Sequence, residues 1–158
     1  MKRIVFMRHS YALSAVDTDV KTDALRPLSD KGIAAAEHAA IALEAKALNP
    51  KKILTSPRLR AKQTADILTE RLSNNVPVEV CTELDGNTPM PDMWQFIKDN
   101  IAPNEVIVVV GHNPDLSALV TALSNTHIAL SPAEFAILDF TDDFTVINMK
   151  PLSDYTTL

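Results

Sequence analysis

Short apolar runs alternate with longer amphipathic stretches over about the first 124 residues of the chain. Branched and aromatic residues dominate these runs, as is typical of strands that are covered on both faces. The strongest run has five consecutive apolar β-formers, Val106 to Val110, and predicts a central parallel strand. The pattern predicts strands over residues 4–7, 52–55, 76–80 and 106–110.

Helical spacing of apolar residues between these runs predicts four helices. Ser29 is the expected N-cap of the first, because it precedes an alanine-rich stretch with apolar residues at helical spacing, namely Ile33, Ala36, Ala40 and Leu43. Ser56-Pro57 and Asn113-Pro114 each place a capping residue before a proline, which favours helix starts there. The remaining helices are therefore expected over residues 57–72, 92–101 and 114–123.

Two further strand-like runs, 134–140 and 145–149, are separated by Asp142-Asp143 and predict a hairpin. The alternation of strands and helices before them indicates an α/β fold. We expect a three-layer sandwich, with helices flanking a mainly parallel sheet of about six strands. A length of 158 residues favours a single domain over residues 1–158.

Composition narrows the classes of function. A net charge of −5 makes nucleic acid and anionic membranes unexpected partners, so any anion site must be local. One cysteine, Cys81, and four histidines far apart in sequence offer no recognisable metal-ligand spacing, and we expect neither a metal nor another cofactor. The apolar run at residues 4–7 is too short for a signal peptide, so the expected location is the cytoplasm.

Three of the strand-to-helix junctions carry histidine or arginine. Arg8-His9 follows the first strand, Arg58 and Arg60 follow the second, and His112 follows the fourth. Carboxyl ends of parallel strands meet at one edge of a sheet, so these side chains are expected to converge. Guanidinium groups and helix N-termini together suit a phosphoryl group.

The expected pocket lacks the usual nucleotide-binding elements. Only three glycines occur in the chain, and they form neither a GxGxxG nor a P-loop motif, so ATP binding is not expected. An imidazole is largely neutral at cytoplasmic pH and can act as a nucleophile. One histidine can therefore attack phosphorus while the other stays protonated and binds charge.

Four ordered segments of the chain resemble the motifs of the histidine phosphatase, or phosphoglycerate mutase-like, superfamily. Arg8-His9-Ser10 is similar to its RHG signature, and Gly111-His112-Asn113-Pro114 to its GHNP segment. The segments 26–32 and 56–65 are similar to RPLTxxG and SPxxRAxQTA. The short chain most resembles the compact branch typified by the phosphohistidine phosphatase SixA.

The resemblance implies a role for each matching residue. His9 would be the nucleophile that becomes phosphorylated, Arg8 and Arg60 would bind the phosphoryl oxygens, and His112 would stabilise their charge as an imidazolium. Arg26 matches a motif arginine at the edge of the pocket. Arg58 lies two positions before the motif arginine, so we expect it at the surface or the rim.

Two positions depart from the family pattern or match it only briefly. Ser10 replaces the usual glycine, and its hydroxyl could donate to phosphate. Glu83, with Asp85 as the alternative, matches the acidic proton donor of family phosphomonoesterases. The stretch from Asp17 to Asp23 is expected to be an exposed loop.

The implied activity is metal-independent hydrolysis of phosphohistidine on a protein, through an intermediate on His9. The short connection between the third and fourth strands leaves little room for a lid, which favours a folded phosphohistidine-bearing domain as substrate. One alternative is a phosphomonoesterase for a small metabolite. Another is a phosphate-binding module without turnover.

Overall fold

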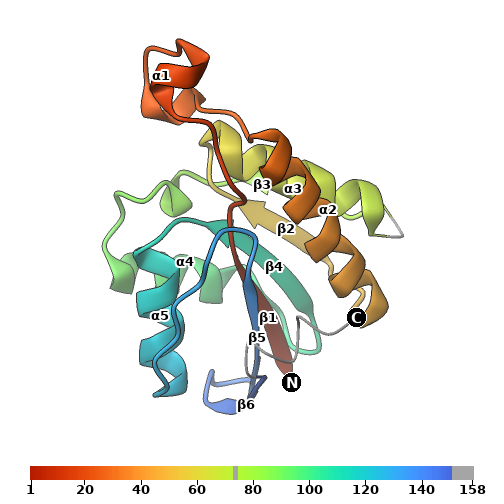
Figure 1. The fold of residues 1–158 in the computed structure, drawn as a ribbon. Helices are drawn as coiled ribbons and strands as arrows, with labels where there is room; N and C mark the ends of the chain where they lie inside the picture. The colour runs from red at the N-terminus through yellow and green to blue at the C-terminus, as the bar shows by residue number, and fades with distance from the viewer. Residues whose placement is uncertain (73–74, 151–158) are drawn as a thin grey trace.

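A six-stranded sheet forms the centre of the computed structural model, which describes residues 1–72 and 75–150, and its strand order is β3-β2-β4-β1-β5-β6 (Figure 1). The first four strands run parallel, whereas β5 pairs antiparallel with β1 and β6 pairs antiparallel with β5. The prediction of a mainly parallel sheet is thus confirmed. The strands are β1 (Lys2–Arg8), β2 (Lys52–Thr55), β3 (Val78–Val80), β4 (Val106–Gly111), β5 (Phe135–Phe140) and β6 (Val146–Met149).

The central strand β1 is buried on both faces, as its apolar run predicts. Ile4 and Phe6 belong to one hydrophobic core and Val5 and Met7 to another, because successive side chains of a strand point to opposite faces. Strand β4 divides its apolar residues between the two cores in the same way. Both strands are therefore held in the middle of the molecule with a fixed register.

Helices cover both faces of the sheet (Figure 1). Helices α2 (Asp30–Ala45) and α3 (Leu59–Arg71) pack on one face, and α4 (Met90–Asp99) and α5 (Asp115–Ser124) pack on the other. This arrangement confirms the predicted three-layer sandwich. Among the described residues, no helix combines the length and the apolar character needed to cross a membrane.

The helix starts follow the predicted caps only in part. Ser29 caps α2 through its side chain, which accepts a hydrogen bond from Gly32 N. The predicted cap at Ser56 is wrong, because α3 begins at Leu59 and its N-cap residue is Arg58. The Ser56 hydroxyl accepts from Arg58 N and is also bonded to the His112 ring. The predicted apolar face of α2 also needs one correction, because Ile33 is 41% exposed.

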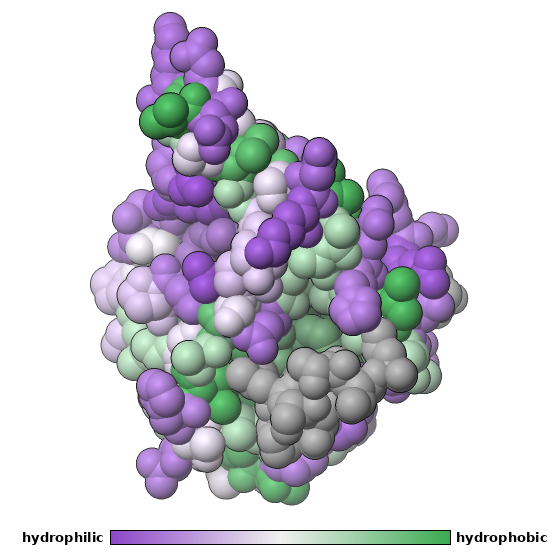
Figure 2. Space-filling model, viewed as in Figure 1, coloured by the Kyte–Doolittle hydropathy of each residue, from purple (hydrophilic) through white to green (hydrophobic). Residues whose placement is uncertain are grey.

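A projecting segment was not predicted. It contains α1 (Ala15–Thr18) and the 3-10 turn η1 (Asp23–Leu25), and it extends past the end of the sheet where β1 and β2 finish (Figure 1). Its surface is mostly hydrophilic (Figure 2). A second 3-10 turn, η2 (Thr82–Leu84), follows β3. Both short turns lie near the junctions that carry the candidate chemistry.

Candidate active site

Two histidines meet at the carboxyl ends of the central strands. Arg8 in β1 is paired in register with Gly111 in β4, and His9 N donates to Gly111 O over 3.0 Å. His9 and His112 therefore leave the sheet side by side, with ring centroids 5.1 Å apart. The expected convergence of these junctions is present in the structure.

The His9 ring is held in one tautomer. Its Nδ1 lies 2.7 Å from Ser10 O, and a carbonyl oxygen can only accept, so Nδ1 carries the proton. Nε2 is then unprotonated and has a lone pair. It accepts a long hydrogen bond of 3.4 Å from Arg60 Nε. An unprotonated nitrogen directed at a guanidinium is well placed to attack a group that the guanidinium binds.

The two motif arginines approach the site from different elements. Arg60 lies in the first turn of α3 and is only 6% exposed. Arg8 ends β1 and donates from Nη1 to Leu130 O over 3.1 Å, and its buried Nε has no hydrogen-bond partner among the described residues. Burial increases the strength of any charge interaction that these groups make with an anion.

His112 is anchored through one ring nitrogen. Its Nε2 is hydrogen-bonded to Ser56 Oγ over 2.7 Å, and the same oxygen accepts a hydrogen bond from Arg58 N. Its Nδ1 is buried and has no hydrogen-bond partner within the part of the chain that the structure describes. Buried polar atoms are rarely left unpaired, and they cluster where a ligand would supply the missing partner.

Burial keeps both histidines neutral in the free protein. Desolvation is the main cause that lowers the pKa of His9 to about 4, and nearby arginines lower it further. Desolvation, followed by the proximity of His9 and Arg60, lowers the pKa of His112 to about 3. The His112 ring is therefore neutral in the free protein, and its role as an imidazolium beside a bound phosphoryl group stays a prediction. An anion in the site would favour protonation of this ring.

The motif residues around the catalytic groups connect neighbouring segments. Thr64 Oγ1 accepts from Ser10 N over 3.0 Å and donates to Arg60 O over 2.8 Å, while Gln63 Oε1 accepts from Leu28 N over 2.7 Å. The bonds from Ser10 N and Leu28 N fix α3 against the segments that follow β1 and precede α2. The motif match alone does not predict this role for Gln63 or Thr64.

Ser10 is turned away from the catalytic groups. It is fully buried, and its hydroxyl donates to Gly32 O over 2.6 Å. A Cβ at Gly32 would lie 1.9 Å from Tyr11 O, so only glycine allows this approach of α2. The expected contact between the Ser10 hydroxyl and phosphate therefore does not fit the structure. The hydroxyl joins β1 to α2 instead.

Asp23 lies beside the site, although it belongs to the stretch that was expected to be an exposed loop. Its carboxylate accepts hydrogen bonds from Arg26, Arg58 and Arg60. These bonds bring both Arg26, the expected edge residue, and Arg58, the expected rim residue, next to Arg60. A carboxylate three positions before an arginine could have indicated the Asp23–Arg26 pair, but not the contact with α3.

The expected proton donor has a less direct position. Glu83 is partly buried in η2, where its Oε1 accepts from Thr82 Oγ1 over 3.2 Å. The same connection does reach the site, because Asp85 O accepts from Arg58 Nε over 2.8 Å and a Cβ at Gly86 would lie 3.7 Å from His112 Cδ2. A role for Glu83 or Asp85 as an acid stays a prediction.

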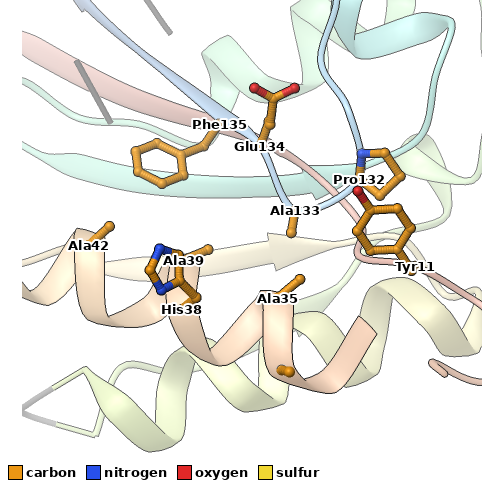
Figure 3. Close-up of a pocket in the computed structure, with 10 residues that line it drawn as sticks. Tyr11, Ala35, His38, Ala39, Ala42, Pro132, Ala133, Glu134 and Phe135 are labelled. Carbon is orange, nitrogen blue, oxygen red and sulfur yellow. The ribbon is translucent and has the colours of Figure 1, made fainter. Parts of the chain in front are cut away.

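A cavity of about 450 Å³ lies between α2 and the start of β5 with the residues just before it (Figure 3). Tyr11, His38, Glu134 and several alanines line it, whereas His9 and His112 do not. Over the described ranges, no three histidine, cysteine or acidic side chains are grouped in a way that could hold a metal ion. Since the cavity lining includes no arginine and neither candidate histidine, phosphoryl chemistry points to the arginine and histidine cluster rather than to this cavity.

Known structures share the fold over nearly the whole chain. The protein histidine phosphatase SixA in complex with tungstate matches with a TM-score of 0.78 at 22% identity, covering 96% of this chain and 98% of that one. The phosphohistidine phosphatase SixA proposed for Agrobacterium tumefaciens matches equally well, covering 94% and 97%. A glucosyl-3-phosphoglycerate phosphatase of mycobacteria has a TM-score of 0.71 at 20% identity, covering 95% and 97%.

Sequence comparison identifies the family. An uncharacterized protein of Picosynechococcus sp. (strain ATCC 27264 / PCC 7002 / PR-6) is 34% identical over 125 residues, which make up 77% of this chain and 72% of that protein. The sequence pattern of the histidine phosphatase superfamily (branch 1) matches residues 4–86, which include Arg8, His9 and Arg60. With this match and the paired histidines, the chain belongs to the histidine phosphatase superfamily.

Proposed function

We propose that the protein is a metal-independent phosphatase that hydrolyses phosphohistidine on a protein through a phosphorylated His9. One observation carries the proposal. The His9 tautomer leaves Nε2 unprotonated and directed at Arg60 Nε, so nucleophile and charge-stabilising group share the point where a phosphoryl group would sit. A phosphate-binding module would need the arginines but not this tautomer.

The reaction has two balanced steps. In the first, the His9 Nε2 lone pair forms a bond to phosphorus while the bond from phosphorus to the substrate nitrogen breaks. The leaving imidazole departs neutral when the phosphoimidazole is already protonated. In the second, the oxygen of water forms a bond to phosphorus while the bond from phosphorus to His9 Nε2 breaks. His9 leaves as neutral imidazole, and both protons of water leave with the product as dihydrogen phosphate. Arg8 and Arg60 stabilise the charge on the phosphoryl oxygens in both steps.

The substrate class follows from leaving-group chemistry. An alkoxide needs a positioned acid, which typically contributes about 10² to 10⁴ in rate. Imidazole has a pKa of about 6.5 and leaves with far less help. Glu83 makes its hydrogen bond to Thr82 and Asp85 makes one to Asn87 N, so neither carboxylate is bonded to His9 or His112. This geometry favours a substrate with a good leaving group. We expect that substrate to be a phosphohistidine on a protein, and we expect the reaction to take place in the cytoplasm.

The experiment compares three variants on a phosphohistidine protein and on a sugar phosphate. We expect His9→Ala to abolish turnover and the trapped phosphoenzyme, because no neighbour replaces Nε2. Arg60→Ala should lower kcat/KM on the phosphohistidine protein by about 10²-fold or more. Glu83→Gln should change it less than about threefold, since no acid is needed. Circular dichroism of each variant controls for folding.

A specific observation also supports a small-metabolite phosphomonoesterase. Enzymes with this fold include the mycobacterial glucosyl-3-phosphoglycerate phosphatase described above. Fast hydrolysis of the sugar phosphate that is lost in Glu83→Gln would establish this alternative and overturn the phosphohistidine assignment. If no substrate gives a phosphoenzyme on His9, the protein would instead be a phosphate-binding module without turnover.

A further inference from the structure

Asp23 connects the projecting segment to three arginines at the site. Its Oδ1 accepts from Arg26 Nη1 over 2.9 Å, and its Oδ2 accepts from Arg58 Nη1 and, over 3.0 Å, from Arg60 Nη2. Its main-chain oxygen accepts from Arg60 Nη1 over 2.9 Å. One residue of η1 therefore bonds to both terminal nitrogens of the Arg60 guanidinium.

These bonds determine where the third nitrogen of Arg60 points. A guanidinium is planar and rigid, so holding Nη1 and Nη2 fixes the direction of Nε–H. That direction is toward His9 Nε2, 3.4 Å away. The Arg60 main chain is held separately, because its carbonyl accepts from Thr64 Oγ1. Side chain and main chain of Arg60 thus have independent supports.

The negative charge of Asp23 also affects the neighbouring arginines and any bound anion. Hydrogen bonds from Arg26 and Arg60 lower the pKa of this carboxyl to about 2, so it is ionised at neutral pH. Its negative charge offsets the mutual repulsion of the three guanidinium groups. The same charge also repels a phosphoryl dianion, so it should weaken anion binding while it orders the arginines.

We propose that Asp23 is a positioning residue that holds the Arg60 guanidinium so that Nε–H meets the phosphoryl group as it joins His9 Nε2. This inference rests on the proposed function, because it assigns Arg60 to the reaction. Asp23 itself contacts no reacting atom. The opposite role would be an internal anion that occupies the arginines and inhibits the enzyme, and the two roles predict opposite changes in kcat.

The variants are Asp23→Ala and Asp23→Asn, with Asp19→Asn as the matched control. Asp19 is an exposed acid in the same segment, and its φ of 54° suits asparagine, so the control removes one negative charge without touching the arginines. We expect both Asp23 variants to lower kcat by about 10²-fold, the usual cost of misplacing a catalytic group by about 1 Å. Tungstate should bind equally well or a few-fold more tightly, and Asp19→Asn should keep kcat within about twofold.

A measurement without turnover separates this inference from the proposed function. In the wild type and in Asp19→Asn, the Arg60 Nε–H should exchange slowly with solvent by NMR, because its guanidinium is fixed. In both Asp23 variants exchange should be at least about tenfold faster. Unchanged exchange, an unchanged or raised kcat, or loss of tungstate binding in the Asp23 variants would each overturn the positioning role. Failure of the wild type to turn over any substrate would instead refute the proposed function.

Discussion

At the scale of single residues, the site depends on histidines that stay neutral inside a cationic cluster. Burial lowers the pKa of His9 to about 4 and that of His112 to about 3, and the arginines add to both effects. A neutral His9 is what nucleophilic attack requires. In the free protein Asp23 supplies one negative charge to three of the arginines. A phosphoryl dianion adds further negative charge to this cationic cluster, so substrate and site are electrostatically complementary.

The histidine pair should make the free protein less stable in acid. Each pKa is lower in the folded than in the unfolded state, so between pH 6.5 and 5 the unfolded chain binds more protons. Stability must therefore fall as the pH falls through this range, by up to about 1.5 kcal/mol for each histidine. Between pH 6.5 and pH 5, the free energy of unfolding of the double variant His9→Asn, His112→Asn should therefore fall by about 3 kcal/mol less than that of the wild type.

Urea unfolding at pH 6.5 and at pH 5, in a buffer without phosphate, measures this difference. Other titrating groups are common to both proteins, so they cancel in the comparison. Asp23 does not interfere, because a carboxyl with a pKa of about 2 contributes only at lower pH. Equal losses in the two proteins would show that the histidines titrate normally.

At the scale of elements, the sequence predicted structure well where a local pattern decides it. The apolar run of β4 and the Ser29 cap of α2 needed no tertiary information. Ser56 shows the limit. Serine before proline is a good local cap, yet His112, 56 positions later, bonds to its hydroxyl and α3 starts further on. Asp23 was missed for the same reason, since Arg58 and Arg60 lie 35 and 37 positions away.

The junction between α2 and the segment after β1 gives a prediction at this scale. Alanine normally stabilises a helix relative to glycine by about 1 kcal/mol. Gly32→Ala should instead destabilise the protein by on the order of 3 kcal/mol, because its Cβ would lie 1.9 Å from the Tyr11 carbonyl oxygen. Turnover should fall as well, since Ser10 and His9 move with that backbone.

Gly111→Ala is the matched control for this substitution. There the nearest atom to an added Cβ is the end of a flexible side chain, Leu116 Cδ1, at 3.3 Å. Chemical unfolding should give a cost below about 1.5 kcal/mol for the control. A Gly32→Ala protein as stable as the control would mean that α2 can shift without loss.

At the scale of the whole molecule, the sheet brings together residues that are distant along the chain. His9 follows β1, Arg60 follows β2 and His112 follows β4, and the parallel pairing of these three strands places them at one edge. The order of elements was enough to predict this convergence. The projecting segment with α1 and η1 was not predictable, because its short, polar elements carry no strong periodicity.

An oxyanion that touches residues from all three strands should stabilise the fold as a whole. Binding to the folded state alone adds about 2.7 kcal/mol when the ligand is present at 100 times its Kd. For a protein of this size we expect tungstate to raise Tm by about 5 to 10 °C. The rise should be equal with and without EDTA, because arginines rather than a metal bind the anion.

Variants of two arginines in α3 test whether the rise in Tm depends on the site. Arg60→Ala should lose most of the tungstate shift, whereas Arg71→Ala should keep it, because Arg71 lies at the other end of the helix and pairs with Glu44 over 3.2 Å. Both variants remove one positive charge, so a general effect of net charge would reduce the shift in both. Loss of the shift in EDTA would place a metal in the site. An undiminished shift in Arg60→Ala would move anion binding away from His9, since Arg60 is the arginine whose Nε faces the nucleophilic nitrogen.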